Sequence, residues 1–229
     1  MKLNKILDRI DEENNFNDES NNDFANFREI CMGSIAHGKL YRSSHPAPNG
    51  VEDIVISSKS KRAGIKTIIN FTDDKDGLKY SKDSPWYWEL VKSKSVIALH
   101  TDFDFMGRYF CGKFRKAIEF MLSHKPPYLI HCYAGVDRTG FASMIIESLM
   151  DANMQEIIDD YLLSYDFGIG SAINTKDEKV VKEQLKEINK GKEATEENLK
   201  SIADRYFSEK VGLTRGQIEA LKKILASKI

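Results

Sequence analysis

The chain has 229 residues, of which 41% are hydrophobic and 30% are charged, and this composition is typical of a globular protein with a sizeable core. Its 34 basic and 35 acidic residues give a formal net charge of −1, which argues against a protein that binds nucleic acid or an anionic membrane through bulk charge. No apolar run approaches the ~20 residues that an integral membrane helix needs. The sequence therefore predicts neither kind of partner, and it leaves the oligomeric state open.

The cellular location is predicted from the N-terminus and the cysteines. Residues 1–10 contain two lysines but no apolar run, so we expect no signal peptide, while a signal removed beforehand would leave secretion open. Three cysteines, Cys31, Cys111 and Cys132, are too few for a disulfide framework and favour a reducing compartment. We therefore expect a cytoplasmic protein.

The first half of the chain predicts alternating strands and helices. Residues 1–25, rich in Asn, Asp and Glu, are expected to form a polar arm, and residues 26–229 a single domain. Apolar patterning predicts strands over 39–42, 65–71, 95–100 and 128–131, and helices over 51–62, in part over 78–92, and over 110–121. Pro85 breaks or starts the second helix, and Pro126 stops the third. This alternation predicts an α/β fold with a central, mostly parallel sheet flanked by helices.

The second half predicts only helices, so we expect a helical C-terminal portion over about 141–229. Apolar spacing predicts helices over 141–150, 154–163, 176–190, 195–211 and 214–225. The pairs Thr175/Glu178 and Thr214/Gln217 have the spacing of a capping box. We interpret the Lys/Glu-rich stretch over 176–200 as a solvated helix face, with a lid or a partner surface as the alternative.

Chemistry is concentrated in the stretch Tyr128-Leu-Ile-His-Cys-Tyr-Ala-Gly-Val-Asp-Arg-Thr-Gly140. A buried strand runs into Cys132, and an apolar helix begins near Arg138. The thiol is thus expected at the carboxyl end of a strand and at a helix N-terminus, where open α/β sheets bind ligands. The alternative is that Cys132 is an inert core thiol and Arg138 a cation at a helix start.

This Cys-x5-Arg loop suits a phosphate ester. Successive backbone N–H groups and the helix dipole attract an anion, and the Arg138 guanidinium can hold two phosphate oxygens. The same positive field stabilises a thiolate at Cys132. Gly135 permits a backbone conformation that a side chain would obstruct, and Thr139 could donate to the departing sulfur. The expected substrate-binding residues are Tyr133, Ala134, Gly135, Val136, Asp137, Arg138 and Thr139.

The full string His-Cys-x-x-Gly-x-x-Arg-Thr-Gly resembles the active-site signature of the cysteine-dependent protein tyrosine phosphatase superfamily. Asn26-Phe-Arg-Glu-Ile30, Gly38-Lys-Leu-Tyr-Arg-Ser-Ser44 and Ala63-Gly-Ile-Lys-Thr-Ile-Ile-Asn-Phe71 are similar to successive blocks of a bacterial tyrosine phosphatase family. The second block is shared with the atypical dual-specificity phosphatases. The resemblance covers most of residues 26–227 and implies a phosphatase fold and a phosphocysteine intermediate, with no cofactor and no metal.

Three positions depart from the bacterial family. Glu29 and Asn70 each replace an Asp, and Val136 stands where many members carry Lys. In the family that lysine accompanies phosphoinositide activity, so its absence weakens a lipid-phosphate interpretation.

The resemblance also implies an Asp general acid on a loop that precedes the signature. Asp102 and Asp104, in Leu99-His-Thr-Asp-Phe-Asp-Phe105, fill this place. We prefer Asp102, which lies nearer the strand end. Asp104 and Asp137 are the alternatives, and each could instead be a loop carboxylate bound to backbone.

Two further residues are expected to support the loop: His131 by ordering it through hydrogen bonds, and Arg42 by bracing it rather than by contacting substrate.

The predicted function is hydrolysis of phosphomonoesters, with phosphotyrosine protein as the leading substrate and dual specificity as an extension. The alternatives are an inositol phosphate or phosphoinositide phosphatase, with Lys125, Arg108 and Lys113 as added cations, and an inactive module that binds a phosphorylated ligand. A redox enzyme would need a resolving cysteine nearby in sequence.

Overall fold

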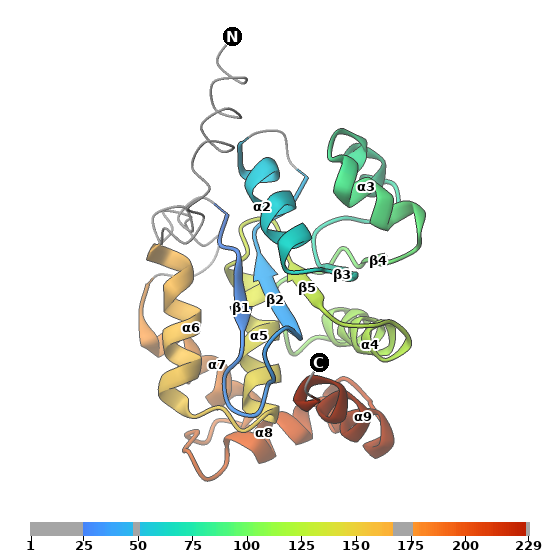
Figure 1. The fold of residues 1–229 in the computed structure, drawn as a ribbon. Coiled ribbons are helices and arrows are strands. Elements are labelled where there is room, and N and C mark those ends of the chain that lie inside the picture. The colour runs from blue at the N-terminus through green and yellow to red at the C-terminus, as the bar shows by residue number, and fades with distance from the viewer. Residues whose placement is uncertain (1–24, 48–50, 167–175, 228–229) are drawn as a thin grey trace.

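The computed structural model describes residues 25–47, 51–166 and 176–227. In this part of the chain, five short strands form one sheet in the order β1-β2-β5-β3-β4 (Figure 1). The strands are β1 (Arg28–Ile30), β2 (Leu40–Ser43), β3 (Thr67–Asn70), β4 (Val96–Ala98) and β5 (Tyr128–His131). The predicted α/β fold with a mostly parallel sheet is confirmed.

The register of the sheet brings several strand ends to one edge. The strands β2, β5, β3 and β4 are parallel, and only β1 pairs antiparallel, with β2. His131 at the end of β5 lies opposite Ser43 of β2 and Asn70 of β3, and Asn70 lies opposite Ala98 of β4. The loop that leaves β5 at Cys132 therefore lies between the loops that leave its neighbours.

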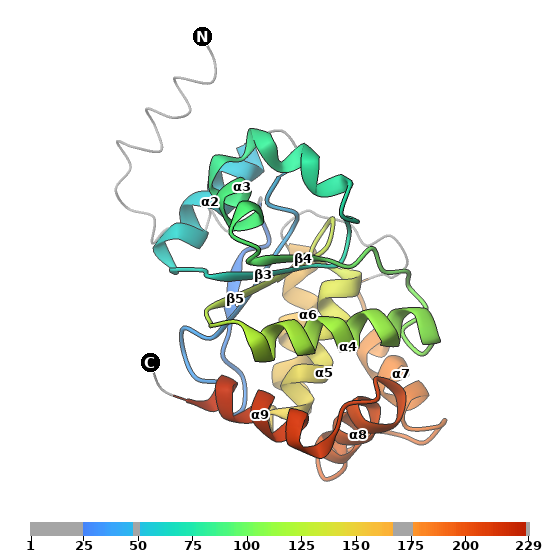
Figure 2. The same ribbon diagram turned by 90° about the vertical axis from the view of Figure 1, so that its right-hand side faces the viewer.

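Helices cover both faces of the sheet. Figure 2 shows α2 (Val51–Arg62) and α3 (Pro85–Lys92) on one face, and α4 (Arg108–Ser123) and α5 (Asp137–Leu149) on the other. The remaining elements are the 3-10 helix η2 (Gly77–Asp83), α6 (Met154–Asp166), α7 (Glu178–Ile188), α8 (Leu199–Arg205), the π-helical turn η3 (Tyr206–Lys210) and α9 (Arg215–Ala226). After β5, the described residues form helices and connecting loops, as predicted.

The side chains of β5 alternate between two cores, as they must in a strand buried on both faces. Tyr128 and Ile130 point into the larger core, which α4 and α5 share with the C-terminal helices. Leu129 points into the smaller core beneath α2 and α3. Burial on both faces fixes the register of β5, and with it the position of Cys132.

Local signals explain most helix boundaries. Pro85 is the first residue of α3, because its missing N–H is not needed there. The capping box of Thr214 and Gln217 opens α9 as predicted. Asp177 caps α7 by accepting from the N–H of Lys179, whereas Thr175 lies outside the described residues.

The structure differs from the expected elements in two places. The strand β1 was not predicted, because three residues give no periodic signal, and the single helix expected over 195–211 is divided into α8 and η3. The helix α5 begins at Asp137, as predicted near Arg138, and so extends the apolar stretch over 141–150 toward the loop. Residues 1–24 of the predicted arm lie outside the described residues, and Ala25 is fully buried, accepting from the N–H of Ser44.

None of the helices in the described part of the chain combines the length and the apolar character needed to cross a membrane.

Candidate active site

Cys132 lies directly after β5, at the start of a loop that leads into α5. Its side chain is almost fully buried, with 3% of the residue exposed. Gly135, in the middle of this loop, has φ +73°, and a Cβ atom there would lie 2.5 Å from the carbonyl oxygen of Ser43. The loop can therefore pass this close to the end of β2 only with glycine at that position.

Arg138, in the first turn of α5, joins the loops that follow β3 and β4. Its Nη1 donates to the carbonyl oxygen of Phe71 at 3.1 Å and to that of Thr101 at 3.2 Å. The guanidinium also lies under the ring of Phe103, 4.9 Å from its centroid. These contacts fix the guanidinium beside the loop that begins at Cys132.

Two polar groups at the start of α5 have no partner within the described part of the chain. They are the buried Nε of Arg138 and the buried hydroxyl of Thr139. Buried donors without a partner are costly, so they mark a place where a ligand can supply acceptors. The oxygens of a phosphate group are acceptors of this kind.

A second arginine braces the loop from behind. Arg42 is fully buried on β2, and its Nη2 donates to the carbonyl oxygen of Gly135 at 2.8 Å. The Nδ2 of Asn26 donates to the same oxygen at 3.1 Å. The N–H of His45 also donates to the carbonyl oxygen of Tyr133, at 2.9 Å. The predicted bracing contact of Arg42 is thus confirmed, and Asn26 makes a second such contact with the loop.

The charge of Arg42 is balanced by a buried carboxylate on α6. Asp160 accepts from Nη1 of Arg42 and, at 2.7 Å, from Nε of Arg28. Burial opposes ionisation of Asp160, but the two guanidinium groups lower its pKa to about 2. Glu147 on α5 is also buried, and its pKa is raised well above the ordinary value by burial and by the charge of Asp160.

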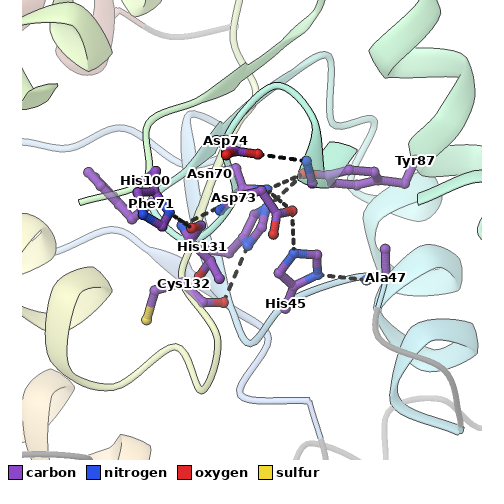
Figure 3. Close-up of polar contacts among 12 residues, drawn as sticks. His45, Ala47, Asn70, Phe71, Asp73, Asp74, Tyr87, His100, His131 and Cys132 are labelled. Atoms are coloured by element: carbon purple, nitrogen blue, oxygen red, sulfur yellow. Dashed lines mark hydrogen bonds and ion pairs between the residues drawn. The ribbon is translucent and has the colours of Figure 1, made fainter. Parts of the chain in front are cut away.

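A chain of hydrogen bonds leads from the loop after β3 to the nucleophile strand (Figure 3). The carbonyl oxygen of Cys132 can only accept, so Nδ1 of His131 carries the proton in their 3.3 Å contact. Nε2 of His131 must then accept from the hydroxyl of Tyr87 at 3.1 Å. The Tyr87 oxygen accepts from Nδ2 of Asn70 at 2.9 Å, and Nδ2 also donates to Asp73 at 2.8 Å. The direction of each bond is thereby fixed.

The state of His131 follows from its surroundings. Burial and the neighbouring His45 lower the pKa of His131 well below its ordinary value, so its ring is neutral. The contact with the Cys132 carbonyl agrees with the predicted ordering role. His100, in the loop after β4, contacts the carbonyl oxygen of Thr72 at 3.1 Å and so links two loops.

The three candidate acids have different surroundings. Asp102 is exposed, and both of its chain neighbours, Thr101 and Phe103, contact Arg138. The carboxylate of Asp104 lies against Gly107, the N-cap of α4, where a helix N-terminus stabilises a negative charge. Asp137 is buried in the first turn of α5. The structure therefore brings both chain neighbours of Asp102 into contact with the arginine.

The remaining predicted loop residues divide by exposure. Tyr133 is exposed and Ala134 is partly exposed, whereas the side chain of Val136 is fully buried. Val136 can therefore meet a ligand only through its backbone. Lys125, considered as an extra cation, lies at the opposite edge of the sheet, where its carbonyl oxygen accepts from Thr67 at the start of β3.

One group of side chains could hold a metal ion elsewhere. Ligand atoms of Glu29, Cys31 and His37, on the hairpin of β1 and β2, lie within 4.8 Å of one another. The hairpin turn precedes Leu40, the first residue of β2, whereas Ser43, the last residue, lies opposite His131. The possible metal group and Cys132 are therefore at opposite ends of these strands. The three cysteines are all free thiols, as predicted.

Comparison with known proteins decides the family. The sequence model described as the tyrosine phosphatase family matches residues 21–227. The chain belongs to this family. This match supports a cysteine-based phosphatase and agrees with the resemblance found in the sequence. Comparison with curated proteins found no matching sequence.

Two solved structures are similar to the chain. One is TpbA of P. aeruginosa, with 17% identity and a TM-score of 0.45, where the match covers 78% of this chain and 96% of TpbA. The other is the core catalytic domain of the PP-IP phosphatase SIW14 of S. cerevisiae, in complex with citrate. It has 20% identity and a TM-score of 0.43, and the match covers 72% of this chain and 93% of that domain.

Sequence reasoning missed Asn26 and Asp160 as parts of the site's support. Asn26 belongs to the Asn-Phe-Arg block that carried the resemblance, and this block was the available signal. Asp160 had none, since it is one of several acidic residues on a charged helix.

Proposed function

We propose that the chain hydrolyses phosphomonoesters through a phosphocysteine intermediate on Cys132. The observation that carries this proposal is the placement of Arg138, whose Nη1 is bound to the loops after β3 and β4 while its buried Nε has no described partner. Such an arrangement leaves one edge of the guanidinium for phosphate oxygens, next to a thiol at a helix N-terminus.

In the first step, the Cys132 thiolate attacks phosphorus. A P–S bond forms, and the bond from phosphorus to the leaving oxygen breaks. Arg138 and the loop N–H groups stabilise the charge on the three remaining oxygens. In the second step, water attacks phosphorus and the P–S bond breaks, with the Thr139 hydroxyl donating to the departing thiolate. Inorganic phosphate is released.

We assign the general acid to Asp102. In the first step its carboxyl group gives a proton to the leaving oxygen, and in the second the carboxylate takes a proton from the attacking water. Support comes from Thr101 and Phe103, which place Asp102 between two contacts with Arg138. Asp104 lies at the N-cap of α4 instead, and the burial of Asp137 in the first turn of α5 suits a structural role.

Phosphotyrosine protein is the substrate class that we propose. Cys132 is 3% exposed, whereas its chain neighbour Tyr133 and Phe103, whose ring contacts Arg138, are 67% and 40% exposed. A buried nucleophile with exposed aromatic rings in the same site favours a phosphate carried on a long, flat side chain over the shorter phosphoserine. Exposed aromatic rings also offer stacking surfaces for a phenyl group.

The proposal is tested with a phosphotyrosine peptide, a phosphoserine peptide, an inositol polyphosphate and a phosphoinositide, each supplied without metal to the wild type and to Cys132→Ser. We expect phosphate release from the phosphotyrosine peptide, its loss in Cys132→Ser, and inhibition by vanadate. Faster phosphate release from an inositol phosphate or a phosphoinositide would show that this class, and not phosphotyrosine protein, is the preferred substrate. Binding without any release would identify an inactive phospho-ligand module.

A further inference from the structure

A cavity of about 400 Å³ opens beside the nucleophile loop. The side chains that matter for its chemistry are those of His45, Asp73, Tyr80, Ser81, Asp83 and Tyr133. Tyr133 directly follows Cys132. Thr72, which also lines the cavity, directly follows Phe71, whose carbonyl oxygen accepts from Arg138. The cavity therefore shares Tyr133 with the Cys132–Arg138 loop, and it lies one residue away from the Phe71 carbonyl that binds Arg138.

The charge of this cavity is negative. Asp73 and Asp83 lie in its wall. Burial alone would raise the pKa of Asp73, but hydrogen bonds from His45 and Asn70 hold it below the ordinary value, so its carboxylate stays ionised. His45 contacts Asp73 through Nε2 at 2.8 Å, and its Nδ1 accepts from the N–H of Ala47 at 3.0 Å, so both ring nitrogens are already engaged.

The lysines nearest in sequence do not neutralise the cavity. Lys79 pairs with Asp76 at 2.6 Å, and the ammonium group of Lys82 lies 5.7 Å from the ring centroid of Trp88. Neither lysine lines the cavity.

Aromatic rings form its rim. Tyr80 is 82% exposed and Tyr133 is 67% exposed, and they are the two most exposed large apolar side chains among the described residues. An aromatic face beside a carboxylate is a favourable setting for an ammonium or guanidinium group. Both rings are free to stack on such a group at low cost, because they are already in water.

The cavity wall also contains a hydroxyl group that forms no hydrogen bond with the described part of the chain. Ser81 is 1% exposed, and its Oγ has no hydrogen-bond partner within the described part of the chain. A buried hydroxyl of this kind marks a place where a ligand can supply a hydrogen-bonding partner, here an N–H donor.

We propose that this cavity is a subsite for a lysine or arginine side chain of the substrate, next to the phosphorylated tyrosine in sequence. This inference rests on the proposed phosphotyrosine activity and narrows it to phosphoproteins with a basic neighbour. A polyanion such as an inositol polyphosphate would be repelled by the same two carboxylates.

The test uses phosphotyrosine peptides of otherwise neutral sequence, with a single Lys or a single Glu at each position flanking the phosphotyrosine. At one position or more, we expect kcat/KM for the Lys peptide to exceed that for the Glu peptide about tenfold. Asp83→Lys should abolish or invert this ratio. Asp83 is chosen because it is exposed, whereas Asp73 supports the hydrogen-bond chain to His131.

Glu89→Lys is the matched control. Glu89 lies on α3, is highly exposed, pairs with Lys92 and does not line the cavity, and the substitution changes net charge by the same amount. Its Lys/Glu ratio should equal that of the wild type. A ratio near one at every position, or equal effects of Asp83→Lys and Glu89→Lys, would overturn the subsite.

Binding of the same peptides to Cys132→Ser separates the two proposals. In one outcome the wild type releases no phosphate, but Cys132→Ser binds Lys peptides more tightly than Glu peptides. If the double variant Cys132→Ser/Asp83→Lys then loses this preference for Lys peptides, the subsite is supported and the enzymatic proposal is wrong. If phosphate is released with no preference in rate or in binding, the enzymatic proposal stands and the subsite is overturned. If neither release nor preference is seen, both are wrong.

Discussion

Arg42 and Gly135 are joined by a buried hydrogen bond of 2.8 Å, from Nη2 to the carbonyl oxygen. One end of the Arg42 guanidinium thus holds the phosphate loop, while the other pairs with Asp160 on α6. The conformation of the loop is therefore coupled to the packing of a helix that contributes nothing to the site directly. Stability and activity should respond together when this arginine is changed.

Arg42→Ala tests this coupling. Removing one partner of a buried ion pair leaves Asp160 short of charge compensation, so we expect a loss of about 3–5 kcal/mol in the free energy of unfolding. We also expect a fall in kcat, because the Gly135 carbonyl loses a donor. Urea denaturation and aryl phosphate hydrolysis measure the two effects. The exposed Arg115, paired with Glu119, gives the control Arg115→Ala, which should change stability by no more than about 0.5 kcal/mol. Equal effects of the two variants would contradict the bracing role.

Gly135→Ala tests the geometry of the loop itself. The left-handed φ of +73° costs an L-residue about 1–2 kcal/mol, and the new Cβ would meet the Ser43 carbonyl. The loop must then move, and we expect kcat to fall about 100-fold. Gly216→Ala on α9 has open space around it and should stabilise the protein by about 0.4–1 kcal/mol without changing kcat. Full activity in Gly135→Ala would show that the close approach to β2 is dispensable.

The loop from Cys132 to Arg138 could be predicted because all its parts are close in sequence. A strand of apolar residues, a nucleophile, a glycine and an arginine at a helix start follow one another, so local rules sufficed. The strands β3 and β5 were equally predictable, since burial on both faces leaves a mostly apolar run.

The support of the loop could not be predicted in the same way. Asp160 is 118 positions away from Arg42, and Asn26 is 109 positions away from Gly135. No periodicity links such pairs, and only the packing of β1, β2 and α6 brings them together. The late start of the helix expected from residue 195 has a local cause: Oδ1 of Asn198 accepts from the N–H of Thr195, and α8 begins only at Leu199.

The general acid is tested by comparing Asp102→Asn, Asp104→Asn and Asp137→Asn. We expect Asp102→Asn to lower kcat roughly 100- to 10,000-fold on a phosphotyrosine peptide, whose leaving group needs a proton. The loss should be smaller on an aryl phosphate with an acidic phenol, which leaves without help. The Asp104 and Asp137 variants should show no such dependence on the leaving group. If either of them shows it instead of Asp102, that residue is the acid.

The buried Glu147 should make the free energy of unfolding depend on pH. Its pKa is raised in the folded protein by burial and by Asp160, so the folded state keeps a proton that the unfolded state has lost. Above the unfolded pKa of about 4.3, the free energy of unfolding should therefore fall as pH rises, by up to about 1.4 kcal/mol per unit, until the folded-state pKa is reached.

Glu147→Gln should remove this decline, so its stability relative to wild type should rise from pH 4.5 to pH 8. Urea denaturation across this range measures the difference. The exposed Glu183 on α7 supplies the control Glu183→Gln, for which the difference should not vary with pH. A constant difference for Glu147→Gln as well would mean that Glu147 is ionised in the folded protein.

The central claim is that phosphate passes through the sulfur of Cys132. The most direct measurement is mass spectrometry of peptides from enzyme that has been quenched with denaturant at alkaline pH, where a P–S bond survives, during turnover of an aryl phosphate. We predict one added phosphoryl group on the peptide that contains Cys132, its disappearance after substrate is exhausted, and its absence in Cys132→Ser. Turnover by the wild type with no phosphoryl group on Cys132, or with one on another residue, would contradict the account.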